Sequence, residues 1–96
     1  MIIANVGDKI RITATFIDIN GLATDPTIVR FKILSPNEVE TLWQYPSNIQ
    51  KESTGIYYAE IPIIISGKYL VKFEGLGAVM AATEDILILA NSKFIY

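Results

Sequence analysis

The stretch that decides the fold is Lys9-Ile10-Arg11-Ile12-Thr13-Ala14-Thr15-Phe16-Ile17, in which apolar and polar side chains alternate. The apolar side chains on one face are Ile10, Ile12, Ala14 and Phe16, and the polar ones on the other are Arg11, Thr13 and Thr15. A β-strand turns successive side chains to opposite faces, so this pattern predicts a strand with one buried face. Asn20-Gly21 follows, and because both residues tolerate positive φ, the pair predicts a turn.

The same alternation recurs along most of the chain. It predicts strands over Thr27–Leu34, Glu38–Tyr45, Ile56–Ile61 and Lys68–Glu74, with a short edge strand near Ile49–Lys51. The residues expected to face inward on these strands are Val29, Phe31, Ile33, Val39, Thr41, Trp43, Tyr45, Tyr57, Ala59, Ile61, Tyr69, Val71 and Phe73. Short stretches rich in proline, glycine, serine and asparagine separate the strands, as is typical of turns.

The segment Val79–Leu89 is less regular. Its alanines and Glu84 are compatible with a helix, but Ile86-Leu87-Ile88-Leu89 is rich in β-forming residues and no helix cap precedes it. We therefore favour a strand here over a helix.

The number and spacing of these segments predict the architecture. About seven short strands, spaced by roughly 8–12 residues, are typical of an immunoglobulin-like antiparallel β-sandwich. A compact barrel of about five or six strands is the alternative architecture. The 96 residues suffice for one domain and leave no room for two. We expect a single all-β domain over residues 1–96, with its core at about residues 7–90 and a tail at 91–96.

The composition narrows the classes of partner. Hydrophobic residues make up 51% of the chain, charged residues make up 19%, and the net charge is −2. The basic residues are spread out and interleaved with acidic ones, so no nucleic-acid binding is expected. No apolar run approaches the about 20 residues needed to span a bilayer, so no membrane segment is expected. Met1–Asp8 has neither the basic region nor the apolar run of a secretory signal.

The residues that usually carry chemistry are largely missing. The sequence contains neither histidine nor cysteine, and so lacks the common proton carrier at neutral pH and any thiol nucleophile or thiolate ligand. Asp18, Asn20 and Asp25 surround one loop, but the other ligands of a calcium loop are absent, so we interpret them as turn formers. Gly75-Leu76-Gly77 lacks the third glycine of a dinucleotide motif. The sequence therefore predicts no enzyme, no metal site and no cofactor.

Apolar residues on both faces of some segments are the most informative anomaly. Ile63-Ile64-Ile65 is a continuous run, Ile86 to Leu89 offers aliphatic side chains to both sides, and Phe94-Ile95-Tyr96 follows later. One face of each must point away from a two-layer core, and exposed apolar patches usually mark interfaces. Burial under loops is the alternative. The residues predicted to contact other subunits, in a homo-oligomer or multi-copy assembly, are Ile63, Ile64, Ile65, Leu87, Leu89, Phe94 and Tyr96.

The aromatic residues suggest a second function. Trp43, Tyr45, Tyr57 and Tyr69 all fall on predicted inward faces and are expected in the core. Tyr58 lies on the opposite face from Tyr57, so it is the ring most expected to be exposed. A carbohydrate- or surface-binding adhesion module, with Tyr58 and the loop near Asn20 as its site, is therefore the alternative function.

Several segments, taken in order, resemble those of a known group of proteins. They are Gly7-Asp8-Lys9-Ile10-Arg11-Ile12-Thr13-Ala14-Thr15-Phe16, Asp25-Pro26-Thr27, Ser35-Pro36-Asn37, Ser53-Thr54-Gly55-Ile56-Tyr57-Tyr58-Ala59-Glu60-Ile61, Ser66-Gly67-Lys68-Tyr69, Phe73-Glu74-Gly75-Leu76-Gly77-Ala78 and Ala81-Ala82. Over residues 7 to 89 the sequence resembles small immunoglobulin-like proteins encoded among the virion structural genes of tailed bacteriophages.

The resemblance implies a virion accessory protein, made in the host cytoplasm, that decorates the capsid or sits at the neck or tail. Its partners would be capsid, connector or tail subunits, and it would need no cofactor, because such proteins supply no catalytic motif. The Ile63-Ile64-Ile65 connection departs from this pattern, since a more polar turn is expected there.

Overall fold

The computed structural model of the chain describes residues 1–77, 81–82 and 86–92, and all regular structure in these ranges is β-strand. The strands are β1 (Ile2–Asn5), β2 (Lys9–Thr15), β3 (Ile28–Leu34), β4 (Glu40–Gln44), β5 (Ile49–Ser53), β6 (Ile56–Pro62), β7 (Gly67–Leu76), β8 (Ala81–Ala82) and β9 (Ile86–Asn91). The prediction of an all-β chain is therefore confirmed for the described residues.

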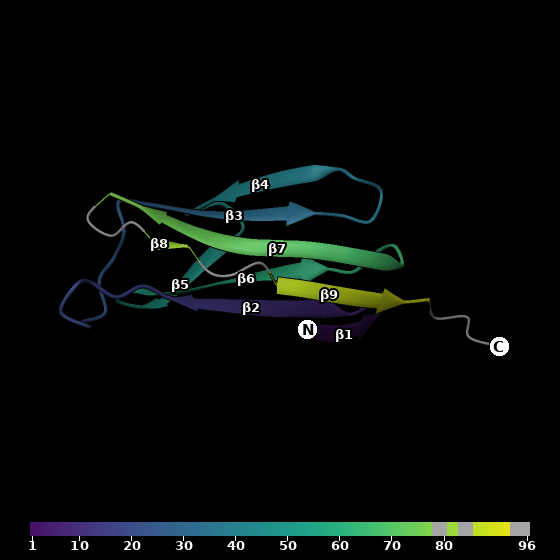
Figure 1. Cartoon of the computed structure of the whole chain (residues 1–96), viewed down its shortest axis with the longest axis horizontal. Helices are drawn as coiled ribbons and strands as arrows, with labels where there is room; N and C mark the ends of the chain where they lie inside the picture. The colour runs from purple at the N-terminus through teal and green to yellow at the C-terminus, as the bar shows by residue number, and fades with distance from the viewer. Residues whose placement is uncertain (78–80, 83–85, 93–96) are drawn as a thin grey trace.

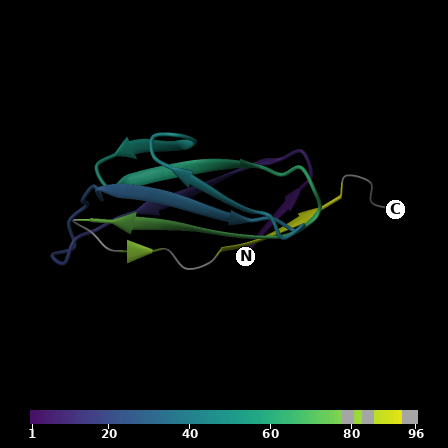
Figure 2. The same ribbon diagram turned by 90° about the horizontal axis from the view of Figure 1, so that it is seen from above.

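The strands form two sheets (Figure 1). The larger sheet has the order β1-β9-β7-β3-β4, with β8 pairing beside β7, and the smaller sheet has the order β2-β6-β5. All pairs are antiparallel except β1 with β9, which is parallel. After a 90° turn, β7 lies in one layer and β6 in the other (Figure 2). The core fills the space between these layers.

The inward faces predicted from the alternation are largely the ones that are buried. The most buried hydrophobic side chains on the strands are Ala4, Ile12, Ala14, Val29, Phe31, Ile33, Ile49, Tyr57, Ala59, Ile61, Tyr69, Val71, Phe73, Ile88 and Ala90, and Phe16 and Ile63 join them from just beyond strand ends. The rings of Phe31 and Phe73 pack with their centroids 4.5 Å apart. Phe16 meets Tyr57 edge-on at 5.9 Å. Aromatic pairs of this kind stabilise a core beyond the area they bury.

The structure differs from the sequence-based prediction at the first strand. Residues 2–5 form β1, and Ala4 lies in the core, so the core begins before residue 7. The alternation did not reveal this strand, because only four residues pair and they have one neighbour, β9. Asn91, predicted to open the tail, is the last residue of β9. Ile86–Leu89 is a strand as favoured, whereas 78–80, 83–85 and 93–96 lie outside the described residues.

The inward face predicted for Glu38–Tyr45 is wrong in part. Val39 is 52% exposed and Tyr45 39%, Thr41 is exposed, and Trp43 is half-buried. Tyr45 follows the end of β4, where its ring packs edge-on against Tyr57 with the centroids 5.3 Å apart. For Val39, Thr41 and Trp43 the cause is the short third strand of the opposite sheet, because β5 pairs with β6 only from Ile56 to Ala59. Beyond that point the smaller sheet has no third strand to cover the start of β4.

Pro62 is tolerated in β6 because it lies where one edge of that strand has no neighbouring strand. Phe16 donates to the Gly55 carbonyl at 2.7 Å and Ile63 to the Asp8 carbonyl at 2.9 Å, which sets the alternation of the β2–β6 bonds. The backbone nitrogen of Pro62 therefore points away from β2, toward the edge of β6 that β5 does not cover. A proline has no N–H to donate there, which weakens this edge as a template for another strand.

Gly75 shows how tightly the layers approach. A Cβ atom at this position would lie 2.7 Å from Cε1 of Phe16 and 2.9 Å from Cγ of Pro26, both of which are buried. Because these groups cannot move freely in a packed core, a side chain at position 75 forces them apart.

We expect Gly75→Ala to destabilise the fold by about 1–3 kcal/mol, the usual cost of overpacking, as measured by urea unfolding. The control is the same substitution in a Phe16→Leu background, where the atom nearest the new Cβ is removed. The cost of the alanine should fall by about 1 kcal/mol in that background, since residues in contact do not act additively. Equal costs in both backgrounds would contradict the steric explanation.

Candidate functional site

The outer face of the larger sheet carries a group of aliphatic side chains on adjacent strands. The strand register places Leu87 opposite Leu70, and Leu70 opposite Leu34, in one row across β9, β7 and β3. Ile3 of β1 pairs with Leu89 of β9, beside that row. We call these five residues, Ile3, Leu34, Leu70, Leu87 and Leu89, the leucine face.

These side chains lie on the solvent side because their neighbours fill the core. Ile88 and Val71, next to them in sequence, are buried. Ile3 is 63% exposed, Leu34 and Leu70 are exposed, and Leu87 and Leu89 are half-buried. A shallow hollow of about 630 Å³ adjoins the face where β3 and β7 meet the turns at Pro36 and Gly67. An apolar surface of adjacent strands with a hollow beside it has the character of a docking site.

Charged side chains lie beside the leucine face on the same outer surface of the larger sheet. Among the described residues, the outward positions of β3, β4 and β7 carry the cations Arg30, Lys32, Lys68 and Lys72 and the carboxylates Glu40 and Glu74. Lys32 and Glu74 form an ion pair of 3.2 Å. Counted over these described residues, the outer face carries more cations than carboxylates, although the whole chain has a net charge of −2. A partner surface with acidic groups would suit this distribution.

The seven predicted contact residues do not gather in one place. Leu87 and Leu89 lie on the leucine face, while Ile64 is 74% exposed in the loop between β6 and β7. Ile63 is only 1% exposed, so the expectation that the isoleucine run is exposed does not hold for it. Its backbone continues the pairing of β6 with β2, which turns the side chain inward after Ile61. Ile65 is half-buried against the core, and Phe94 and Tyr96 lie outside the described residues.

The prediction missed three members of the leucine face. Leu34 and Leu70 occupy outward positions of correctly predicted strands, and Ile3 lies on the unpredicted β1. The sequence could have revealed Leu34 and Leu70. Each is an aliphatic residue at a strand position that the alternation assigns to solvent, and the same anomaly pointed to Leu87.

In the alternative carbohydrate-binding site, one face of the Tyr58 ring is already covered by another side chain. The Arg11 guanidinium carbon lies 4.1 Å from the centre of the Tyr58 ring, which is half-buried, and Arg11 also approaches Glu60 at 3.5 Å. Cation–π contact of this kind holds the ring against its neighbour. Asn20 lies in the turn of the β2–β3 loop, where its N–H donates to Oδ1 of Asp18 at 2.8 Å. Stacking on a ligand would have only the other face of Tyr58 to use.

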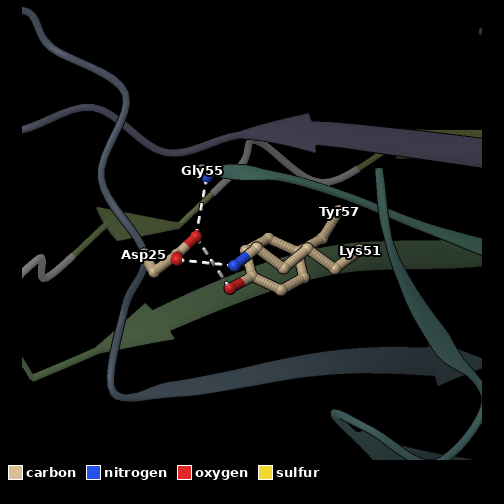
Figure 3. Close-up of polar contacts among 4 residues, drawn as sticks. All are labelled: Asp25, Lys51, Gly55 and Tyr57. Carbon is tan, nitrogen blue, oxygen red and sulfur yellow. Dashed lines mark hydrogen bonds and ion pairs between the residues drawn. The ribbon is translucent and has the colours of Figure 1, made fainter. Parts of the chain in front are cut away.

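Asp25 is the centre of a polar network at the end of the sandwich that holds the β2–β3 loop (Figure 3). Its Oδ2 accepts from Nζ of Lys51 at 2.7 Å, and its Oδ1 accepts from the N–H of Gly55 at 2.8 Å and from the hydroxyl of Tyr57 at 3.1 Å. Three donors from the β5–β6 hairpin thus converge on one carboxylate from the β2–β3 loop. The network ties these two connections together.

The electrostatics of this network favour a structural role. The hydrogen bond from Lys51, followed by that from Gly55, lowers the pKa of Asp25, and the hydrogen bond to Asp25 raises the pKa of Lys51. Burial, followed by the hydrogen bond to Asp25, raises the pKa of Tyr57 to about 12. Each group is thus held more firmly in its ordinary ionisation state, the opposite of the tuning that proton transfer near neutral pH requires.

Acidic residues do not assemble into a cation site in the part of the chain that the structure describes. Asp18 bonds to its own loop, whereas Asp25 bonds to the β5–β6 hairpin. Within the same described ranges there is no helix with the length and apolar character to cross a membrane. No known protein-family model matches the sequence, and a search of curated proteins finds no match.

We expect the Asp25 network to make stability depend on pH in the acid range. Because the pKa of Asp25 is lowered in the folded state, its contribution is present above the ordinary carboxyl pKa of 3.8 and is lost as the pH falls through the lower folded value. Thermal unfolding between pH 6 and about pH 2.5 should show a steeper loss of Tm for the wild type than for Asp25→Asn. Parallel curves for the two proteins would contradict this role.

Proposed function

We propose that the chain is a non-enzymatic docking module with an immunoglobulin-like sandwich, and that it serves as a virion structural protein. The strand order supports the immunoglobulin-like fold. In that fold one sheet contains strands B, E and D and the other contains strands G, F and C, extended by C′ in the variable type. Strands β2, β6 and β5 match the first sheet, and β9, β7, β3 and β4 match the second. Strand β1 is then the first strand, paired with β9.

The observation that carries the docking function is the leucine face. Leu34, Leu70 and Leu87 stand opposite one another on three adjacent strands. Both inner faces of the sandwich already fill the core, so these side chains add nothing to the interior. Covering each of them with a partner removes apolar surface from water, which favours association at about 25 cal/mol per Å². Repeated copies on a regular lattice would need only modest affinity at each site.

The virion assignment rests on the sequence resemblance over residues 7 to 89. It gives the partner class as capsid, connector or tail subunits, and it gives the location as the virion after synthesis in the host cytoplasm. The surplus of lysine and arginine around the leucine face adds a physical requirement. The surface that receives the module should present acidic side chains around an apolar centre.

The test is incorporation into particles assembled in cells that carry the gene. We expect the wild-type chain to sediment with purified virions, and Leu70→Glu to reduce its occupancy by about 30-fold or more, as for an interface hot spot. Leu70 is the right position because it stands between Leu87 and Leu34 at the centre of the row.

The matched control is Thr13→Glu, which places the same charge at an exposed position of β2 on the smaller sheet. Circular dichroism establishes that both variants fold. The proposal is wrong if the wild-type chain is absent from the particles, or if Leu70→Glu is incorporated as well as Thr13→Glu.

A further inference from the structure

The loop between β2 and β3 presents isolated apolar side chains to solvent. Ile19 is fully exposed at its tip, and Ile17 and Leu22 are exposed beside it. We call residues 17–23 the Ile19 loop. None of these three side chains takes part in the core or in the leucine face, so neither the fold nor the proposed function accounts for them.

The Ile19 loop is held in one shape by its own hydrogen bonds. Oδ1 of Asp18 accepts from the N–H of Asn20 at 2.8 Å and from that of Leu22 at 3.0 Å. The N–H of Asp18 donates to the Leu22 carbonyl at 2.9 Å, and Ile17 forms a β-bridge with Ala23. A loop that is already ordered loses little conformational entropy when it binds. Its apolar tip is therefore suited to insertion into a pocket.

A groove of matching character lies near the other end of the sandwich. It has a volume of about 300 Å³, and the apolar residues that line it include Val39, Trp43, Ile61, Ile64 and Tyr69. It exists because β5 ends before it can cover the start of β4. The volume is that of about ten water molecules, enough for one or two aliphatic side chains.

The loop and the groove of one chain cannot meet. β6 runs from Ile56, beside the Gly55 turn that hydrogen-bonds to Phe16, to Pro62 at the groove. At about 3.3 Å per residue, this strand separates the two features by roughly 20 Å. Figure 1 shows the β2–β3 loop at one end of the molecule and the β3–β4 turn, which leads to Val39, at the other. Only a second copy can bring the two together.

We propose that the Ile19 loop of one copy inserts into the Trp43 groove of the next, so that copies associate head to tail. The area limits the strength of this contact. One or two aliphatic side chains bury roughly 100 Å² each, well below the about 800 Å² per partner of a stable complex. The dissociation constant should therefore be on the order of 1 mM, and the contact becomes effective where copies are already concentrated. A head-to-tail contact generates rings or filaments rather than closed dimers.

Trp43 makes this contact measurable, because it is the only tryptophan of the chain and lines the groove. Between about 10 μM and 1 mM, we expect its emission to shift to shorter wavelength in parallel with a rise in the average mass by sedimentation. Ile19→Asp should abolish both changes. Ile3→Asp is the matched control, since it places the same charge at an exposed isoleucine of the leucine face.

Disulfide cross-linking tests whether the Ile19 loop of one copy lies against the Trp43 groove of another. The chain has no cysteine, so Ile19→Cys and Val39→Cys each introduce a single thiol. When equal amounts of the two variants are oxidised together at about 1 mM, random pairing would give about half of the disulfide-linked dimers as the mixed disulfide, and we expect the contact to raise this share to about nine-tenths.

Two results would overturn the inference. One is a wild-type chain that stays monomeric to 1 mM with unchanged Trp43 emission. The other is association that Ile3→Asp abolishes and Ile19→Asp leaves intact, which would mean that the leucine face joins the copies. Incorporation into virions is measured separately with Leu70→Glu, so the inference and the proposed function can fail separately.

Discussion

The packing of Phe73 against Phe31 is the contact on which the rest of the structure depends. Both rings are fully buried, at the centre of the β3–β7 pair, and they stand directly opposite each other. Because side chains alternate along a strand, a slip of one residue in this pair would exchange the inner and outer faces of both strands. The cost of exposing two phenylalanines fixes the register. That register is also what aligns Leu34 with Leu70 on the outer surface.

The two sheets differ in width, and this difference produces the irregular features of the molecule. The smaller sheet has three strands, and its third strand is paired over only part of β6. Where β5 is missing, the start of β4 loses its cover, and Val39 and Trp43 border a groove instead of a closed core. At the opposite end, the Asp25 network holds the β2–β3 loop against the β5–β6 hairpin. One end is thus tied by polar contacts, and the other is left open and apolar.

The sequence predicts the strands well where the period of two is long and unbroken. Lys9–Ile17 and Lys68–Glu74 are correct to within a few residues, because one side of each strand is buried along its length. It fails where tertiary neighbours decide burial. Val39 and Trp43 have the pattern of core residues, yet their exposure depends on where β5 ends, which local periodicity does not record.

The candidate sites were also predicted where the local pattern was sufficient and missed where tertiary contacts decide the arrangement. Leu87 and Leu89 were found because an apolar run must expose one of its faces. The isoleucine run misled the prediction, because Ile63 continues the β6 ladder and turns inward while Ile64 turns out. The sequence did not predict the Asp25 network either. Asp25, Lys51 and Tyr57 come together only when the β2–β3 loop packs against the β5–β6 hairpin. The sequence analysis interpreted Asp25 only as a turn former, together with Asp18 and Asn20.

The parallel pairing of β1 with β9 has a consequence for how the molecule reaches its native state. It joins Ile2 to Ile88 and Ile3 to Leu89, pairs that are far apart along the chain. Contacts between such distant positions raise the contact order, and β-rich folds of this kind acquire their structure in milliseconds to seconds rather than in microseconds. The leucine face is completed only by this pairing. A nascent chain therefore presents the finished surface only after β9 has been synthesised, which delays premature association during translation.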